Sequence, residues 1–195
     1  TFNHTLGDVQ TLAHELGHAY HSFVLRDTRP TARRYPMTLA ESASMFAEAV
    51  LTDSLLADPE VSAQDRAVLL DTRMARCASS LLNIPMRYFF EKSFYEARAH
   101  GEQSVSQLNA LMLDAQRKCY GDVLDESQMD PWFWASKLHF YITQVSFYNF
   151  PYTFGHLFSQ TIFERARQEG PAFWETYKEL LRRTGSASPE TITRE

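Results

Sequence analysis

Apolar residues recur at helical spacing along most of this chain, and this periodicity constrains its fold more than any other feature. The alternation of apolar and polar residues that is typical of strands is almost absent. Only 7 glycines and 8 prolines interrupt the 195 residues, so few signals would end a helix. The sequence therefore predicts an all-α protein of many helices, with at most one very short hairpin.

The predicted helices follow one another without an internal repeat or a low-complexity tract. Hydrophobic residues make up 44% of the chain, which is enough apolar material for a sizeable core. We therefore expect residues 1–195 to form a single unit. The chain begins without an initiator methionine and stops within a predicted helix start, so we expect it to be a piece of a longer protein.

Composition argues against several kinds of partner. The net charge is −5, and the Lys and Arg residues form no basic stripe, so nucleic acid is not an expected partner. No apolar run approaches the roughly 20 residues that span a bilayer, and no signal peptide is evident, so we expect a cytoplasmic protein without a membrane partner. The two cysteines belong to no CxxC or Cys/His cluster, and a thiolate zinc site is therefore not expected.

The first predicted helix contains the stretch TLAHELGHAYH, residues 11–21, and Asp8 is its expected N-cap. Its apolar residues form one stripe, which we expect to face the core, and the histidines lie on another face. The stripe consists of Val9, Leu12, Ala13, Leu16, Tyr20, Phe23 and Val24.

The histidines of this helix have the spacing of a metal site. Residues four apart differ by about 40° around the helix and about 6 Å along it, so His14 and His18 can present two imidazoles to one zinc ion. Glu15 lies about 100° round the helix, where its carboxylate suits a general base better than a ligand. This HExxH pattern arises by chance in roughly 1 chain in 100, so its context matters. Gly17 costs about 1 kcal/mol against alanine inside a helix, which indicates that another element approaches closely there.

A catalytic zinc site needs a third protein ligand, and the second predicted helix offers two carboxylates on one face. We prefer Glu41 as the ligand, although the run from Thr38 to Glu41 also fits a capping box. Glu48 is either an acceptor that orients a ligand histidine or a solvated charge. His21 lies about 10.5 Å from His14 along the axis, too far for the same ion, and is either a residue around the site or a surface histidine.

Three motifs, in order, resemble the catalytic core of the oligoendopeptidase F branch of the thimet oligopeptidase family of zinc metallopeptidases. They are TLAHELGHAYH, then AESASMFAE, then HFYITQVSFYNFPYTFGHLF near the end. The resemblance spans nearly the whole chain. It implies that the chain is the C-terminal catalytic portion of a longer enzyme. The N-terminal region of that enzyme would be the partner of this chain and would form the other wall of the substrate channel.

The resemblance also implies roles for particular residues. One zinc ion per chain would be held by His14, His18 and Glu41, and Glu15 would be the general base that activates zinc-bound water. The implied substrates are short, unstructured peptides, cut at internal bonds.

Substrate binding and hydrogen bonding to the oxyanion are implied for a histidine and tyrosines of the late aromatic segment. His139, Tyr148 and Tyr152 occupy the matching places. Many relatives have tyrosine where this chain has His156, so the resemblance leaves open which of the four residues is the oxyanion donor.

Two alternatives stay open. One is another HExxH hydrolase, such as an aminopeptidase, although no motif that binds a free amino terminus is evident. The other is a fragment that binds zinc and peptide without turnover, because the rest of the channel is missing. An intact Glu15 argues against a purely structural zinc site, which has no use for a base.

Overall fold

The structure is a computed structural model that describes residues 2–194, and every regular element in that range is helical. The prediction of an all-α fold is confirmed, and the short hairpin is not found among the described residues. The α-helices are α1 (Leu6–Leu25), α2 (Met37–Ala40), α3 (Ser42–Ala57), α4 (Ala63–Ala78), α5 (Ile84–Arg98), α6 (Val105–Tyr120), α7 (Phe133–Ser136), α8 (Phe150–Glu169), α9 (Phe173–Arg183) and α10 (Pro189–Ile192). The shorter helical turns are η1 (Pro30–Arg33), η2 (Ser79–Asn83), η3 (Glu126–Gln128), η4 (Leu138–Tyr141) and η5 (Gly170–Ala172).

The chain divides into two compact units. The first extends to Ala75 and resumes at Phe154, and the second comprises Arg76–Thr153. The expectation that residues 1–195 act as one catalytic unit stays a prediction. Within residues 2–194, no helix combines the length and the apolar character needed to cross a membrane.

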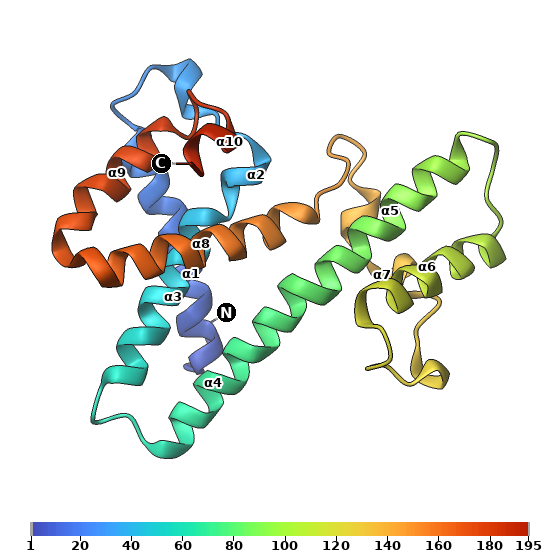
Figure 1. Cartoon of the computed structure of the whole chain (residues 1–195), viewed down its shortest axis with the longest axis horizontal. Helices are drawn as coiled ribbons and strands as arrows, with labels where there is room; N and C mark the ends of the chain where they lie inside the picture. The colour runs from blue at the N-terminus through green and yellow to red at the C-terminus, as the bar shows by residue number, and fades with distance from the viewer. Residues whose placement is uncertain (1, 195) are drawn as a thin grey trace. The chain divides into compact units, whose positions relative to one another are not determined.

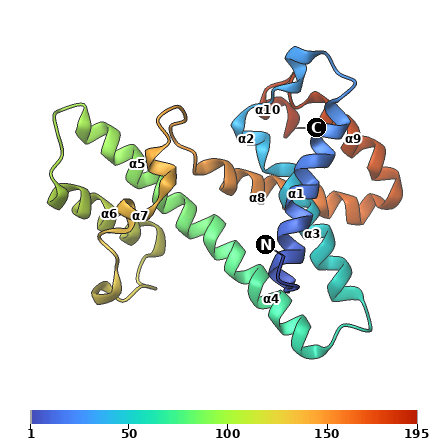
Figure 2. The same cartoon turned by 180° about the vertical axis from the view of Figure 1, so that it is seen from behind.

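In the first unit, α1 lies alongside α3 and also contacts α9, as both views show (Figures 1 and 2). The core of this unit joins these helices to α8 through apolar and aromatic side chains. Its buried members are Val24, Ala43, Phe46, Ile162, Phe163, Phe173, Tyr177 and Leu181.

Helix α1 begins at a capping box. Thr5 is the N-cap, and its hydroxyl accepts from the backbone N–H of Asp8, while the carboxylate of Asp8 accepts from the N–H of Thr5. The prediction that Asp8 is the N-cap is therefore wrong by three positions. A capping box needs a side-chain acceptor at the third helical residue, and the carboxylate of Asp8 supplies it.

The buried face of α1 coincides with only part of the predicted apolar stripe, since Val24 lies in the core and Tyr20 packs against it. Leu12, Leu16 and Phe23 are 50%, 58% and 53% exposed, whereas Gly17 and His21 are buried. The prediction fails for these three apolar side chains because α1 meets α3 through a glycine, at a backbone contact that hydrophobic periodicity does not register.

The second unit is built on a hairpin of α5 and α6, drawn in green to yellow in Figure 1. Its core packs Met86 and Phe90 of α5 against Met112 and Ala115 of α6. The π-helical turn η2 ends at Asn83, two residues before Pro85. Such a turn accommodates a proline, which has no N–H to donate.

Candidate metal centre

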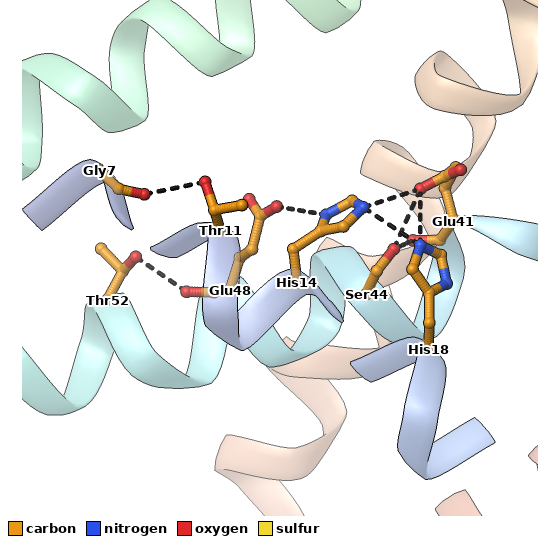
Figure 3. A network of polar contacts seen from close by, with 8 residues as sticks. All are labelled: Gly7, Thr11, His14, His18, Glu41, Ser44, Glu48 and Thr52. Atoms are coloured by element: carbon orange, nitrogen blue, oxygen red, sulfur yellow. Dashed lines mark hydrogen bonds and ion pairs between the residues drawn. The ribbon is translucent and has the colours of Figure 1, made fainter. Parts of the chain in front are cut away.

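Two histidine rings of α1 and one carboxylate meet at a single point in the first unit (Figure 3). Nε2 of His14 lies 3.2 Å from Nε2 of His18. Oε2 of Glu41 lies 3.3 Å from Nε2 of His14 and 3.6 Å from Nε2 of His18. The structure thus brings together the three residues that the sequence predicts as metal ligands.

The triangle of donor atoms fits a zinc ion. Two ligands about 2.1 Å from zinc at the tetrahedral angle lie about 3.4 Å apart. The three observed separations of 3.2, 3.3 and 3.6 Å bracket this value. Two imidazoles and one carboxylate are also the donor set of many catalytic zinc sites, which leave a fourth position open.

Glu41 reaches this point because it lies at the break between α2 and α3. Its side chain caps neither helix, so the capping-box interpretation of Glu41 is wrong. The residue is 5% exposed, and the hydroxyl of Ser44 donates to its Oε2 at 3.1 Å. Burial acts to raise the pKa of Glu41, but the hydrogen bond from His14 and the charges of both histidines outweigh burial and lower it.

Glu48 orients the first histidine. Its Oε1 lies 2.6 Å from Nδ1 of His14, as Figure 3 shows, so the solvated-charge interpretation of Glu48 is wrong. An Nδ1–H that donates to a carboxylate leaves Nε2 with its lone pair toward the other donor atoms. In the chain without metal, the hydrogen bonds to Glu41 and Glu48 raise the pKa of His14 to about 9.

Two glycines allow the backbone to approach the site. A Cβ on Gly17 would lie 2.5 Å from the carbonyl oxygen of Ala43, which confirms the predicted close approach at this position. A Cβ on Gly155 of α8 would lie 2.7 Å from Cβ of Glu41. The contact of Gly155 was not predicted from the sequence, although an isolated glycine in a helical pattern was the signal that identified Gly17.

Two further predicted site residues belong to the same unit. Glu15 is exposed, and the cluster of donor atoms found among the described residues does not include it, so its role as the base stays a prediction. His156 follows Gly155 and is half-buried. Burial lowers the pKa of His156, the charge of Glu48 opposes this effect, and Arg73 adds to it.

The other three predicted residues form a cluster of rings in the second unit. The ring of Tyr148 stacks on His139 at a centroid distance of 5.9 Å, and Tyr152 meets both rings edge-on, at 5.8 and 6.1 Å. Burial, together with the charges of Arg87 and Lys137, lowers the pKa of His139. The structure thus groups these three side chains, and their role at the oxyanion stays a prediction.

His21 is a core residue, which neither sequence interpretation anticipated. It is 0% exposed, its Nε2 lies 2.8 Å from Oγ1 of Thr184, and its ring stacks on Tyr35 at 4.1 Å. The Thr184 hydroxyl donates to the carbonyl of Leu181, so the hydroxyl accepts from Nε2–H of His21. Burial is the main reason that the pKa of His21 falls to about 4.

The fold and the site define a helical protein with a HExxH helix and a glutamate from a neighbouring helix, an arrangement associated with metallopeptidases. The chain belongs to Peptidase family M3, which matches residues 2–195.

The chain is also similar to individual proteins that are named as peptidases. The chain is 32% identical over 187 residues to the chromosomal oligoendopeptidase F of Lactococcus lactis subsp. cremoris, covering 95% of this chain and 30% of the relative. It is 28% identical to the group B oligopeptidase PepB of Streptococcus agalactiae serotype III (strain NEM316), covering 96% and 31%. A crystal structure from Chlamydophila abortus, of a protein named as a peptidase, superimposes with a TM-score of 0.80 at 28% identity, covering 97% of this chain and 32% of that one. The chain therefore spans less than a third of the length of these relatives.

Proposed function

We propose that this chain is the catalytic portion of a zinc-dependent metalloendopeptidase that hydrolyses internal bonds of short oligopeptides. The observation that carries this proposal is the triangle of donor atoms from His14, His18 and Glu41, with edges of 3.2, 3.3 and 3.6 Å. Membership of Peptidase family M3 and the similarity to oligoendopeptidases support the choice of substrate.

His14, His18 and Glu41 would hold one zinc ion, and Glu48 would keep His14 in the tautomer that binds it. When bound, the ion would supply a Lewis acid that polarises the peptide carbonyl and lowers the pKa of water to about 7. Contacts with His14, His18 and Ser44 lower the pKa of Glu41 against the effect of burial, which favours the ionised carboxylate that a metal ligand needs.

Glu15 would move the proton. Its exposed carboxylate accepts a proton from the attacking water as the water oxygen bonds to the peptide carbon. The same group then donates that proton to the amide nitrogen as the C–N bond breaks, so that a carboxylic acid and an amine leave. Glu15 thereby returns to its starting state.

The developing negative charge on the carbonyl oxygen needs hydrogen-bond donors. We assign this role to the set of His139, Tyr148, Tyr152 and His156, whose ring N–H and phenol O–H groups can donate. His156 shares a unit with the proposed ligands, and its half-buried ring feels the charge of Glu48.

The proposed partners are short unstructured peptides and the polypeptide that the longer relatives carry outside the matched region. The exposed side chains of Leu12, Leu16 and Phe23 on α1 support the second partner, because a polypeptide that covers them would bury apolar surface on the helix of the site itself. Neither nucleic acid nor a membrane is a proposed partner.

The test combines zinc content with cleavage of a quenched-fluorescent peptide of about ten residues whose amino terminus is acetylated. We expect one zinc per chain, internal cleavage, loss of zinc in Glu41→Ala, and loss of cleavage with zinc retained in Glu15→Gln. Cleavage only of peptides with a free amino terminus would favour the aminopeptidase. Zinc and peptide binding without cleavage would favour the binding-only fragment. Absence of zinc from the wild-type chain would refute the proposal.

A further inference from the structure

A buried carboxylate holds the segment that carries Tyr148. Glu91 of α5 is 5% exposed, and its Oε1 accepts from the backbone N–H of Phe147 at 2.7 Å. Its Oε2 accepts from the side-chain amide of Asn149 at 3.0 Å, and Asn149 is 0% exposed. One carboxylate therefore binds the residues on both sides of Tyr148.

The backbone of this segment needs such support. Phe147 has a φ of +59°, which a residue other than glycine rarely adopts. The N–H of Asn149 donates to the carbonyl of Phe147 at 2.7 Å, which closes a three-residue turn with Tyr148 at its centre. The ring of Phe147 contacts Tyr88 and Tyr95 at centroid distances of 5.6 and 5.3 Å. A turn of this kind persists only where its surroundings hold it.

We propose that Glu91 is a positioning residue that directs the ring of Tyr148 toward His139 and Tyr152. Its place in catalysis rests on the proposed function, whereas its hold on the turn does not. Both groups that face Glu91 in these contacts are donors, so one carboxylate satisfies both at once. An apolar side chain would leave both donors without acceptors, one of them buried and the other part-buried.

The chain offers a conservative variant. In Glu91→Gln the side-chain carbonyl can still accept from Phe147, and its amide can donate to Oδ1 of Asn149 once the Asn149 amide rotates. That oxygen is buried without a partner in the native chain, so the rotation breaks no other bond. Glu91→Gln therefore preserves both contacts, and Glu91→Ala removes both.

The chain also offers a matched control in the same unit. Gln116 of α6 is 5% exposed and makes two hydrogen bonds to the backbone of Asp130. Its Oε1 accepts from the N–H of Asp130 at 3.1 Å, and its Nε2 donates to the carbonyl of Asp130 at 2.8 Å. Gln116→Ala thus also removes two part-buried contacts to a loop, but that loop carries none of the rings of His139, Tyr148 and Tyr152.

The experiment compares the full chain as wild type, Glu91→Ala, Glu91→Gln and Gln116→Ala, each loaded with zinc. Amide hydrogen exchange at Phe147 and the NMR shifts of the Tyr148 ring show whether the turn and the ring keep their native positions. The values of kcat and KM for the acetylated peptide show whether those positions matter for cleavage. We expect Glu91→Ala to speed exchange at Phe147 by about tenfold or more, to move the Tyr148 ring signals and to lower kcat by about tenfold, with zinc content unchanged.

The variants separate positioning from general stability. Glu91→Gln should restore the wild-type exchange rate and kcat, and Gln116→Ala should lower the melting temperature while leaving Phe147, Tyr148 and kcat as in wild type. Wild-type exchange and ring signals in Glu91→Ala would overturn the proposal, as would an equal loss of kcat in Gln116→Ala. If Glu91→Ala does not fold, Asn149→Ala, which removes one of the two bonds, must show the same changes at Phe147 to a smaller degree. If no variant cleaves peptide, the proposed function fails, and exchange and ring signals still decide whether Glu91 holds the turn.

Discussion

Alanine in place of Gly17 tests the contact that brings α1 against α3. Its Cβ would lie 2.5 Å from the carbonyl oxygen of Ala43 and 2.5 Å from Cα of Ser44, whereas ordinary contact begins at 3.4 Å. The helices would have to separate by the difference, about 0.9 Å, since backbone atoms cannot rotate away as a side chain can.

Two effects of this substitution oppose each other. Alanine inside a helix is favoured over glycine by about 1 kcal/mol. Overpacking against a rigid neighbour costs about 1–3 kcal/mol, so we expect a net decrease of up to about 2 kcal/mol in the free energy of unfolding. Separation of α1 from α3 also moves His14 and His18 away from Glu41, and we expect zinc affinity to fall by at least about tenfold.

Gly7 provides the control on the same helix. A Cβ there would lie 3.6 Å from Oγ1 of Thr5, an ordinary contact. Gly7→Ala should therefore leave zinc affinity unchanged and should not destabilise the chain. Urea unfolding and competition for zinc with a chromophoric chelator measure both quantities. If Gly17→Ala matches Gly7→Ala in both assays, the close approach of α1 to α3 is refuted.

Three further substitutions test other parts of the site and the core. Glu48→Ala should weaken zinc binding by about 10–100-fold, because His14 loses the acceptor on Nδ1; chelator competition measures this, and unchanged affinity would contradict the orienting role. Gly155→Ala should weaken zinc binding while the far-ultraviolet circular dichroism stays helical, because its Cβ would press on Glu41; wild-type affinity would speak against that contact. His21→Phe tests a pH dependence. His21 has a folded-state pKa of about 4, below the 6.5 of an unperturbed histidine, so the unfolded chain binds its proton first. The free energy of unfolding of wild type should therefore fall relative to the variant, by up to about 3 kcal/mol, as pH decreases from 6.5 toward 4, and parallel urea-unfolding profiles would rule this out.

The features of this protein that depend on short-range helix geometry could be predicted from the sequence. Helical periodicity with few interruptions predicted the all-α fold, because hydrogen bonding and side-chain spacing within a helix depend on near neighbours. The i, i+4 spacing placed His14 and His18 together for the same reason, and Gly17 marked a close contact from its cost inside a helix. The choice of Glu41 as the third donor agrees with the structure, although its role as a ligand stays a prediction.

Only the tertiary structure decided which face of α1 is buried and what surrounds the site. Periodicity shows that Leu12, Leu16 and Phe23 share a face, but whether that face meets the rest of this chain depends on residues far away in sequence. The burial of His21 depends in the same way on its contact with Thr184, more than 160 residues later. The approach of Gly155 to Glu41 depends on where α8, a helix distant in sequence, packs. These contacts depend on how helices pack in three dimensions, and short-range spacing along one helix carries no information about that packing.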